Sequence, residues 1–127
     1  MSLRDKMHAE QQLKSLYDEA RGYAFEYADS VAERNVFPSS DAIRGLDSFV
    51  EDMPVENGEG SEILKLLHKF GAPASTAQTG GRYLGYVNGG SITVTLATKW
   101  LTDFCDLNTD IYIMSPIDPT LVSRCKK

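Results

Sequence analysis

The sequence predicts a mainly α-helical chain with short extended segments. The chain has 127 residues, of which 42% are hydrophobic and 24% charged, and this composition is typical of a single globular domain. Apolar residues recur at helical spacing in several separate stretches. A stretch with five of the ten glycines, residues 80–91, separates the helical patterns, and its tyrosines favour extended backbone.

The longest helical pattern covers residues 9–35. Its apolar residues lie on one helix face at steps of four, three, four, three and four: Leu13, Tyr17, Ala20, Ala24, Tyr27 and Val31. Gly22 lowers the helix propensity and could allow a bend. A helix of this length must bury its apolar stripe. The tyrosines on that face suit either an interface with another chain or an ordinary core contact.

Two shorter helices are predicted next. Pro38 ends the first helix, and Ser40 is expected to cap a helix over residues 41–50. An acidic loop follows. The second helix is expected over residues 61–70, with Gly71 as its terminating glycine and Pro73 just beyond.

The glycine-rich stretch is expected to turn at Gly80 and Gly81 and to run extended over residues 82–87. Ser91 is then expected to cap a helix over residues 91–105. Residues 106–110 form an expected polar turn, and residues 111–114 a short extended piece. Asp118 is expected to cap a final helix, residues 119–127, with Pro119 as its first residue.

The sequence argues against non-specific nucleic-acid binding, membrane spanning and export. The net charge is −5, from 13 basic and 18 acidic residues, which argues against non-specific nucleic-acid binding. No stretch approaches the roughly 20 apolar residues that span a membrane. The N-terminus shows no export signal, so Cys105 and Cys125 are interpreted as reduced thiols and the expected location is cytoplasmic.

Common catalytic motifs are not found in the sequence. The glycines match neither a P-loop nor a dinucleotide fingerprint. His8 and His68 lie in different predicted helices without clustered cysteines, so no metal site is expected. The pair His68-Lys69 looks like the lysine site of a pyridoxal-phosphate enzyme, but the end of a helix capped by Gly71 explains it structurally.

Residues 80–116 resemble the N-terminal part of the pyridoxal-phosphate-dependent amino-acid decarboxylases, the group with aromatic-amino-acid and glutamate decarboxylases. The similar pieces, in chain order, are Gly81-Arg82-Tyr83-Leu84-Gly85-Tyr86, Gly89-Gly90-Ser91, Trp100-Leu101, Asp106-Leu107-Asn108 and Met114-Ser115-Pro116. The order and spacing fit over about forty residues. Leu84 and Val87 stand where that family often has aromatic residues, which leaves the substrate preference open.

The resemblance implies the α/β aminotransferase-like architecture (fold type I), of which this chain would be the N-terminal part. By that analogy Tyr86, Val87, Asn88 and Gly89 shape the pocket for an amino-acid substrate, and Gly90 and Ser91 set the turn and the helix start. It also implies a homodimer packed through the N-terminal helices.

The resemblance further implies that pyridoxal 5′-phosphate belongs to a large downstream domain, and we expect none to bind to this chain alone. Five lysines lie in the middle and end of the chain, all in ordinary surface-helix or tail contexts: Lys65, Lys69, Lys99, Lys126 and Lys127. The chain is therefore expected to be an inactive N-terminal fragment of such a decarboxylase. The alternative is a small stand-alone helical module that binds a protein partner; a small enzyme in its own right is disfavoured, since no catalytic constellation is visible.

Overall fold

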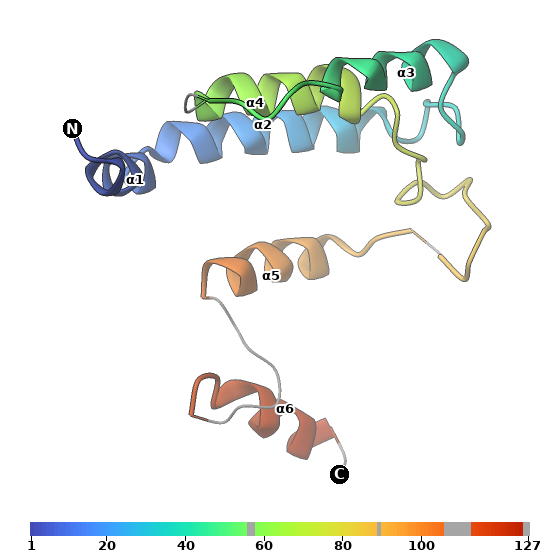
Figure 1. The fold of residues 1–127 in the computed structure, drawn as a ribbon. Helices are drawn as coiled ribbons and strands as arrows, with labels where there is room; N and C mark the ends of the chain where they lie inside the picture. Colours follow the sequence, from blue (N-terminus) through green and yellow to red (C-terminus); the bar gives the residue numbers. More distant parts are fainter. Residues whose placement is uncertain (56–57, 89, 106–112, 126–127) are drawn as a thin grey trace. The chain divides into compact units, whose positions relative to one another are not determined.

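A computed structural model of the chain describes residues 1–55, 58–88, 90–105 and 113–125. The described residues are mainly helical, and no strand occurs among them (Figure 1). The chain divides into two units, Met1–Gly90 and Ser91–Lys127, which are described separately below.

The first unit begins with two helices where the sequence predicted one over residues 9–35. Helix α1 covers Leu3–Gln11 and helix α2 covers Lys14–Ser30. The early start follows from a capping box, because the Ser2 hydroxyl accepts a hydrogen bond from the Asp5 amide at 3.2 Å and the Asp5 carboxylate accepts one from the Ser2 amide. The chain leaves the helical conformation at Leu13, with ψ of 79°, and not at Gly22, which lies inside α2.

The two shorter helices of this unit are present with different ends. Helix α3, Ser40–Gly45, continues into a 3-10 turn, Leu46–Phe49. Its cap is Ser39 rather than Ser40, and the Ser39 hydroxyl accepts a hydrogen bond from the Ala42 amide at 3.2 Å. Helix α4, Gly60–Leu66, continues into a π-helical turn that we call η2, Leu67–Gly71.

Gly71 has a different role from the expected helix terminator. Gly71 is itself the last residue of η2 and Ala72 after it keeps helical dihedral angles, so Gly71 does not stand just outside the helix as predicted. A Cβ atom at position 71 would lie 2.8 Å from the end of the Leu67 side chain, so the glycine lets this leucine pack closely against the π turn.

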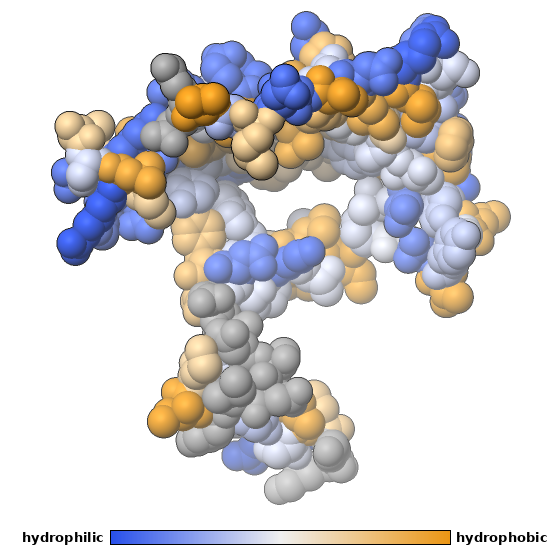
Figure 2. Space-filling view, viewed as in Figure 1, coloured by the Kyte–Doolittle hydropathy of each residue, from blue (hydrophilic) through white to orange (hydrophobic). Residues whose placement is uncertain are grey.

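Helix α2 packs against α4, and α3 and the 3-10 turn pack against η2 (Figure 1). The contacts use small residues, since a Cβ at Gly60 would lie 3.1 Å from Leu16. Little of the unit is buried: among its described residues only Ala77 and Gly80 are. Figure 2 shows apolar side chains on the molecular surface.

The second unit contains helices α5, Thr93–Phe104, and α6, Ile117–Cys125. The residue at the start of α5 is Ile92, which offers no side-chain cap, so the predicted capping role of Ser91 is wrong. Helix α6 begins two residues before the expected start at Pro119, so Asp118 is not its cap. Residues 106–112, which hold the predicted polar turn and half of the predicted extended piece, lie outside the described residues; Ile113 and Met114, the other half, form a turn.

No helix in the described part of the chain is both long and apolar enough to cross a membrane.

Candidate functional site

The residues predicted to shape a substrate pocket lie in an exposed turn of the first unit. Tyr86 and Val87 take left-handed φ angles of 52° and 62°, so the extended segment predicted over residues 82–87 is wrong. Their side chains are almost fully exposed, 92% and 104% relative to the free residue. Gly90 has a φ of 94°, and the turn expected at Gly80 and Gly81 is present without a positive φ at either residue; Gly89 lies outside the described residues.

Hydrogen bonds within the loop hold this turn. The Asn88 amide donates to the Gly85 carbonyl at 3.0 Å, and the Asn88 side chain donates to the Gln78 side chain at 3.1 Å. A Cβ at Gly85 would lie 2.6 Å from the Tyr83 hydroxyl, so glycine lets that tyrosine fold back over the chain. Tyr86, Val87 and Asn88 are thus consecutive residues of one exposed turn, while Ser91 belongs to the second unit.

The base of the loop is anchored beside the end of α2. The Ala77 amide donates to the Val36 carbonyl at 2.9 Å, and the Arg82 guanidinium donates to the Arg34 carbonyl. A Cβ at the buried Gly80 would come within 3.2 Å of Val31. The exposed turn is thus carried on a packed base.

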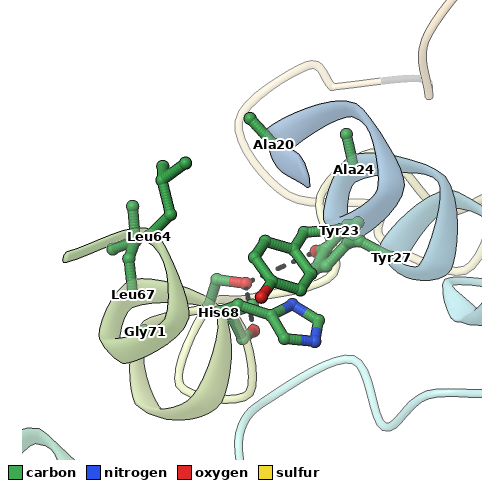
Figure 3. Close-up of a pocket in the computed structure, with 10 residues that line it drawn as sticks. Ala20, Tyr23, Ala24, Tyr27, Leu64, Leu67, His68 and Gly71 are labelled. Carbon is green, nitrogen blue, oxygen red and sulfur yellow. Dashed lines mark hydrogen bonds between the residues drawn. The ribbon is translucent and has the colours of Figure 1, made fainter. Parts of the chain in front are cut away.

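A second candidate site is a groove of about 430 Å³ between α2 and α4–η2 (Figure 3). The helix α2 contributes two alanines and two tyrosines at four-residue spacing, and the opposite wall contributes leucines and a histidine. The lining residues are Ala20, Tyr23, Ala24, Tyr27, Leu64, Leu67, His68, Gly71, Ala72 and Ser75. The groove is mostly apolar, so its chemistry favours binding over catalysis.

Tyr23 of α2 and His68 of η2 contact each other in the lining of the groove. Their rings stack with centroids 4.0 Å apart and an interplanar angle of 11°. The His68 Nε2 atom lies 3.1 Å from a carboxylate oxygen of Glu26, so the π turn is attached to α2 by both a stacked and a polar contact. These contacts give His68 a structural role between η2 and α2, and they do not involve Lys69.

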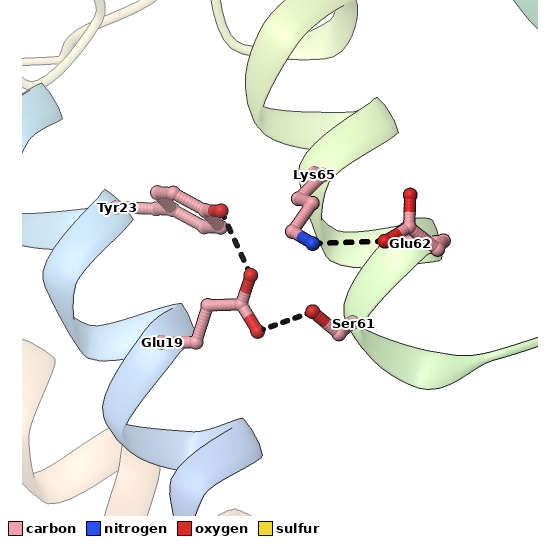
Figure 4. A network of polar contacts seen from close by, with 5 residues as sticks. All are labelled: Glu19, Tyr23, Ser61, Glu62 and Lys65. Atoms are coloured by element: carbon pink, nitrogen blue, oxygen red, sulfur yellow. Dashed lines mark hydrogen bonds and ion pairs between the residues drawn. The ribbon is translucent and has the colours of Figure 1, made fainter.

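A polar network joins the same two helices next to the groove (Figure 4). The Glu19 carboxylate accepts hydrogen bonds from the Ser61 hydroxyl at 2.7 Å and the Tyr23 hydroxyl at 2.8 Å. Both bonds lower the pKa of Glu19, because they stabilise its charged form, and the bond from Ser61 has the larger effect. The bond to Glu19 raises the pKa of Tyr23, since the phenol must keep its proton to donate.

Arg34 lies over the far end of α2. Its guanidinium carbon is 4.5 Å from the centre of the Tyr27 ring, and one guanidinium nitrogen donates to the Ala72 carbonyl at 2.6 Å. The Ser75 hydroxyl donates to the same carbonyl at 2.7 Å. Arg34 thus links the Ala72 carbonyl to the Tyr27 ring of α2, whereas the bond from Ser75 lies within the loop after η2.

The described lysines in the middle and end of the chain do not fit pyridoxal phosphate. A lysine that forms an imine needs a desolvated amine with a lowered pKa. Lys65 has the opposite environment: its side chain is 53% exposed, and a hydrogen bond to Glu62 at 2.8 Å raises its pKa. Lys69 and Lys99 are exposed, and Lys126 and Lys127 lie outside the described residues. We therefore derive no chemical step through this cofactor.

The groove was missed in the sequence, although a signal for it exists. Ala20 and Ala24 are one helical turn apart, as are Tyr23 and Tyr27, and small residues beside aromatic ones allow close approach and stacking. The sequence pattern does not show which segment packs opposite this face. In the structure that segment lies more than 35 positions later in the chain.

Comparisons with protein-family models, with curated proteins and with solved structures find no match to this chain.

Proposed function

We propose that this chain forms the N-terminal part of a pyridoxal-phosphate-dependent decarboxylase that removes the carboxylate of an amino acid. In this proposal the complete enzyme has the α/β aminotransferase-like fold, binds pyridoxal 5′-phosphate through its other parts and works as a homodimer in the cytoplasm. The chain alone is inactive. The support is the similarity of residues 81–86, 89–91, 100–101 and 106–116 to that family.

The observation that carries the proposal is the turn at Tyr86, Val87 and Asn88. A left-handed φ is rare for a β-branched residue, and strained backbone is concentrated at functional sites. Both the Tyr86 and the Val87 side chains extend into solvent from an anchored loop. In the proposed enzyme these side chains would form one wall of the substrate pocket, and the other walls and the cofactor would come from outside this chain.

A chimaera tests the proposal directly. The matching N-terminal segment of an aromatic-amino-acid decarboxylase is replaced by this chain, and release of carbon dioxide from a panel of amino acids is measured. We expect an active chimaera in which Tyr86→Ala lowers kcat/KM by about tenfold or more, because a pocket wall is lost.

The matched control is Met53→Ala in the same chimaera, since Met53 is 89% exposed in a loop outside the turn. Its kcat/KM should stay unchanged. A chimaera that folds and holds its cofactor but releases no carbon dioxide would contradict the proposal, as would equal effects of the two substitutions.

The second candidate is a helical module that binds a protein partner. Its support is the exposure of large apolar side chains, among them Phe25 at 61% and Leu67 at 55% in the first unit. Sequencing the coding DNA past Lys127 separates the candidates. A frame that continues into a His-Lys site favours the decarboxylase, and a stop with nothing related after it favours the module.

A further inference from the structure

Beside the groove between α2 and α4–η2 lies a second hollow with a more polar lining. This hollow has a volume of about 450 Å³ and shares Tyr27, His68 and Ala72 with the groove. It adds Ser30, Arg34 and Lys69 to the lining. The two hollows adjoin at the shared residues, and we call the pair the trough, with an apolar part and a polar end, all within the first unit.

The apolar part suits the side of a helix. Its floor is made of Ala20 and Ala24 from α2, which stand away from the larger Leu64 and Leu67 on the other wall (Figure 3). Small residues let a third backbone approach closely, and two helices packed side by side present a groove that accepts the ridge of another helix. No strand edge lies among the described residues, so pairing with an extended peptide is not offered there.

The polar end carries cations that lack a carboxylate partner. In the described part of the chain, Lys69 makes no ion pair, and its ammonium lies 4.9 Å above the neighbouring Phe70 ring. Arg34 is bonded to a carbonyl and stacked on Tyr27, which leaves its charge unbalanced. The one carboxylate of this hollow, Glu26, is directed to His68.

We propose that this trough binds a partner protein through an amphipathic helix that has acidic residues at one end. The apolar face of that helix lies on Ala20, Ala24 and Leu67, and its acidic end lies between Arg34 and Lys69. The hollow is lined by Arg34 and Lys69 and by one carboxylate, Glu26, and this excess of positive charge sets the direction of the bound helix. The proposal is independent of the decarboxylase proposal.

The test uses the whole chain and two designed helical peptides. Both carry leucines at positions i, i+3, i+4 and i+7; one has glutamates at its N-terminal end and the other has lysines there. Fluorescence anisotropy of labelled peptide measures Kd at low salt. We expect the glutamate peptide to bind about tenfold or more tightly than the lysine peptide, because only its charge complements the trough.

Lys69→Glu should abolish or reverse this preference. The control Lys14→Glu makes the same charge change at the start of α2 and should leave the preference intact. Ala24→Leu, which fills the floor, should weaken both peptides. Should Ala24→Leu fail to fold by circular dichroism, the exposed Lys69 variant still decides.

Equal binding of the two peptides, no binding of either, or a preference that survives Lys69→Glu would overturn the proposal. A second copy of the chain is the competing occupant. In that case sedimentation would show a dimer. Ala24→Leu would dissociate this dimer, whereas the glutamate peptide would not. This outcome would also reject the acidic partner helix.

Discussion

Val87 holds a φ of 62° although its side chain branches at Cβ and is fully exposed. No burial of this side chain compensates for the strained backbone, which costs roughly 1–3 kcal/mol at such a position. The conformation follows from its neighbours, since Asn88 bonds back to Gly85 and Gln78. A residue whose side chain points into solvent despite a strained backbone is a candidate for contact with another molecule.

Replacing Val87 by glycine should stabilise the chain. Glycine takes a positive φ without strain, and this gain exceeds the entropy that glycine adds to the unfolded state, so the free energy of unfolding should rise by up to about 1 kcal/mol. Urea denaturation measures it. The control is Val50→Gly: Val50 is also exposed but has an ordinary φ of −86°, and this change should lower stability by about 0.5–1 kcal/mol. Equal destabilisation by both substitutions would argue against strain at Val87.

At the scale of the elements, α2 and the continuous helix α4–η2 are held together by few contacts of several kinds. Leu16 lies against Gly60, Tyr23 stacks on His68, and Glu19 accepts a bond from Ser61. No residue of either helix is buried. Polar and aromatic contacts therefore carry much of the specificity that a buried core would otherwise give, and they make the pairing sensitive to pH.

Glu19 should make the pairing weaker in acid. Its pKa is lower in the folded chain than in the unfolded chain, so the stabilisation is present above the ordinary glutamate pKa and is lost as the pH falls through the lowered value. Glu19→Gln should flatten the dependence of unfolding free energy on pH below the ordinary glutamate range. Ser61→Ala should act in the same direction, since Ser61 is the largest cause of the shift.

The control for this experiment is Glu51→Gln, a change of the same charge at an exposed loop residue outside the network. Its pH profile should follow that of the unmodified chain. A Glu19→Gln profile that also follows it would show that the network does not couple folding to protons. The raised pKa of Tyr23 acts at alkaline pH. The stability that it contributes is present below the ordinary tyrosine pKa and is lost as the pH rises through the raised pKa of the folded chain.

For the molecule as a whole, both units leave large apolar side chains in contact with solvent. In the second unit no residue of α5 is buried, and Trp100 is 46% and Phe104 58% exposed. These two rings contact each other edge to face, with centroids 6.0 Å apart. Such surface marks a site of association in a protein and favours clustering of the chain when it is alone.

The purified chain should therefore self-associate as its concentration rises. Sedimentation velocity measures the effect, and Trp100→Glu should reduce it because a charge is placed among the apolar residues of α5. Lys99→Glu reverses an exposed charge at the preceding position and should reduce self-association less than Trp100→Glu does. A chain that sediments as a monomer at every concentration would contradict the expectation.

The sequence by itself determined where most helices form. The spacing of apolar residues predicted helix over most of Lys14–Ser30, Gly60–Leu66 and Thr93–Phe104, because helical periodicity is a local property of the chain. Helix ends were less predictable: Ser39 rather than Ser40 caps α3, and Leu13 breaks the first helix without a glycine or proline.

Only the tertiary structure decided the sites. The stacking of Tyr23 on His68 and the bond between Ser61 and Glu19 join residues more than 40 positions apart, and no local pattern encodes such a pair. The left-handed backbone at Tyr86 and Val87 likewise overrides their β propensity, since the loop is held at its base by contacts with Val31, Arg34 and Val36. Local propensity is additive along the chain, whereas a groove and a strained turn depend on which distant segments meet.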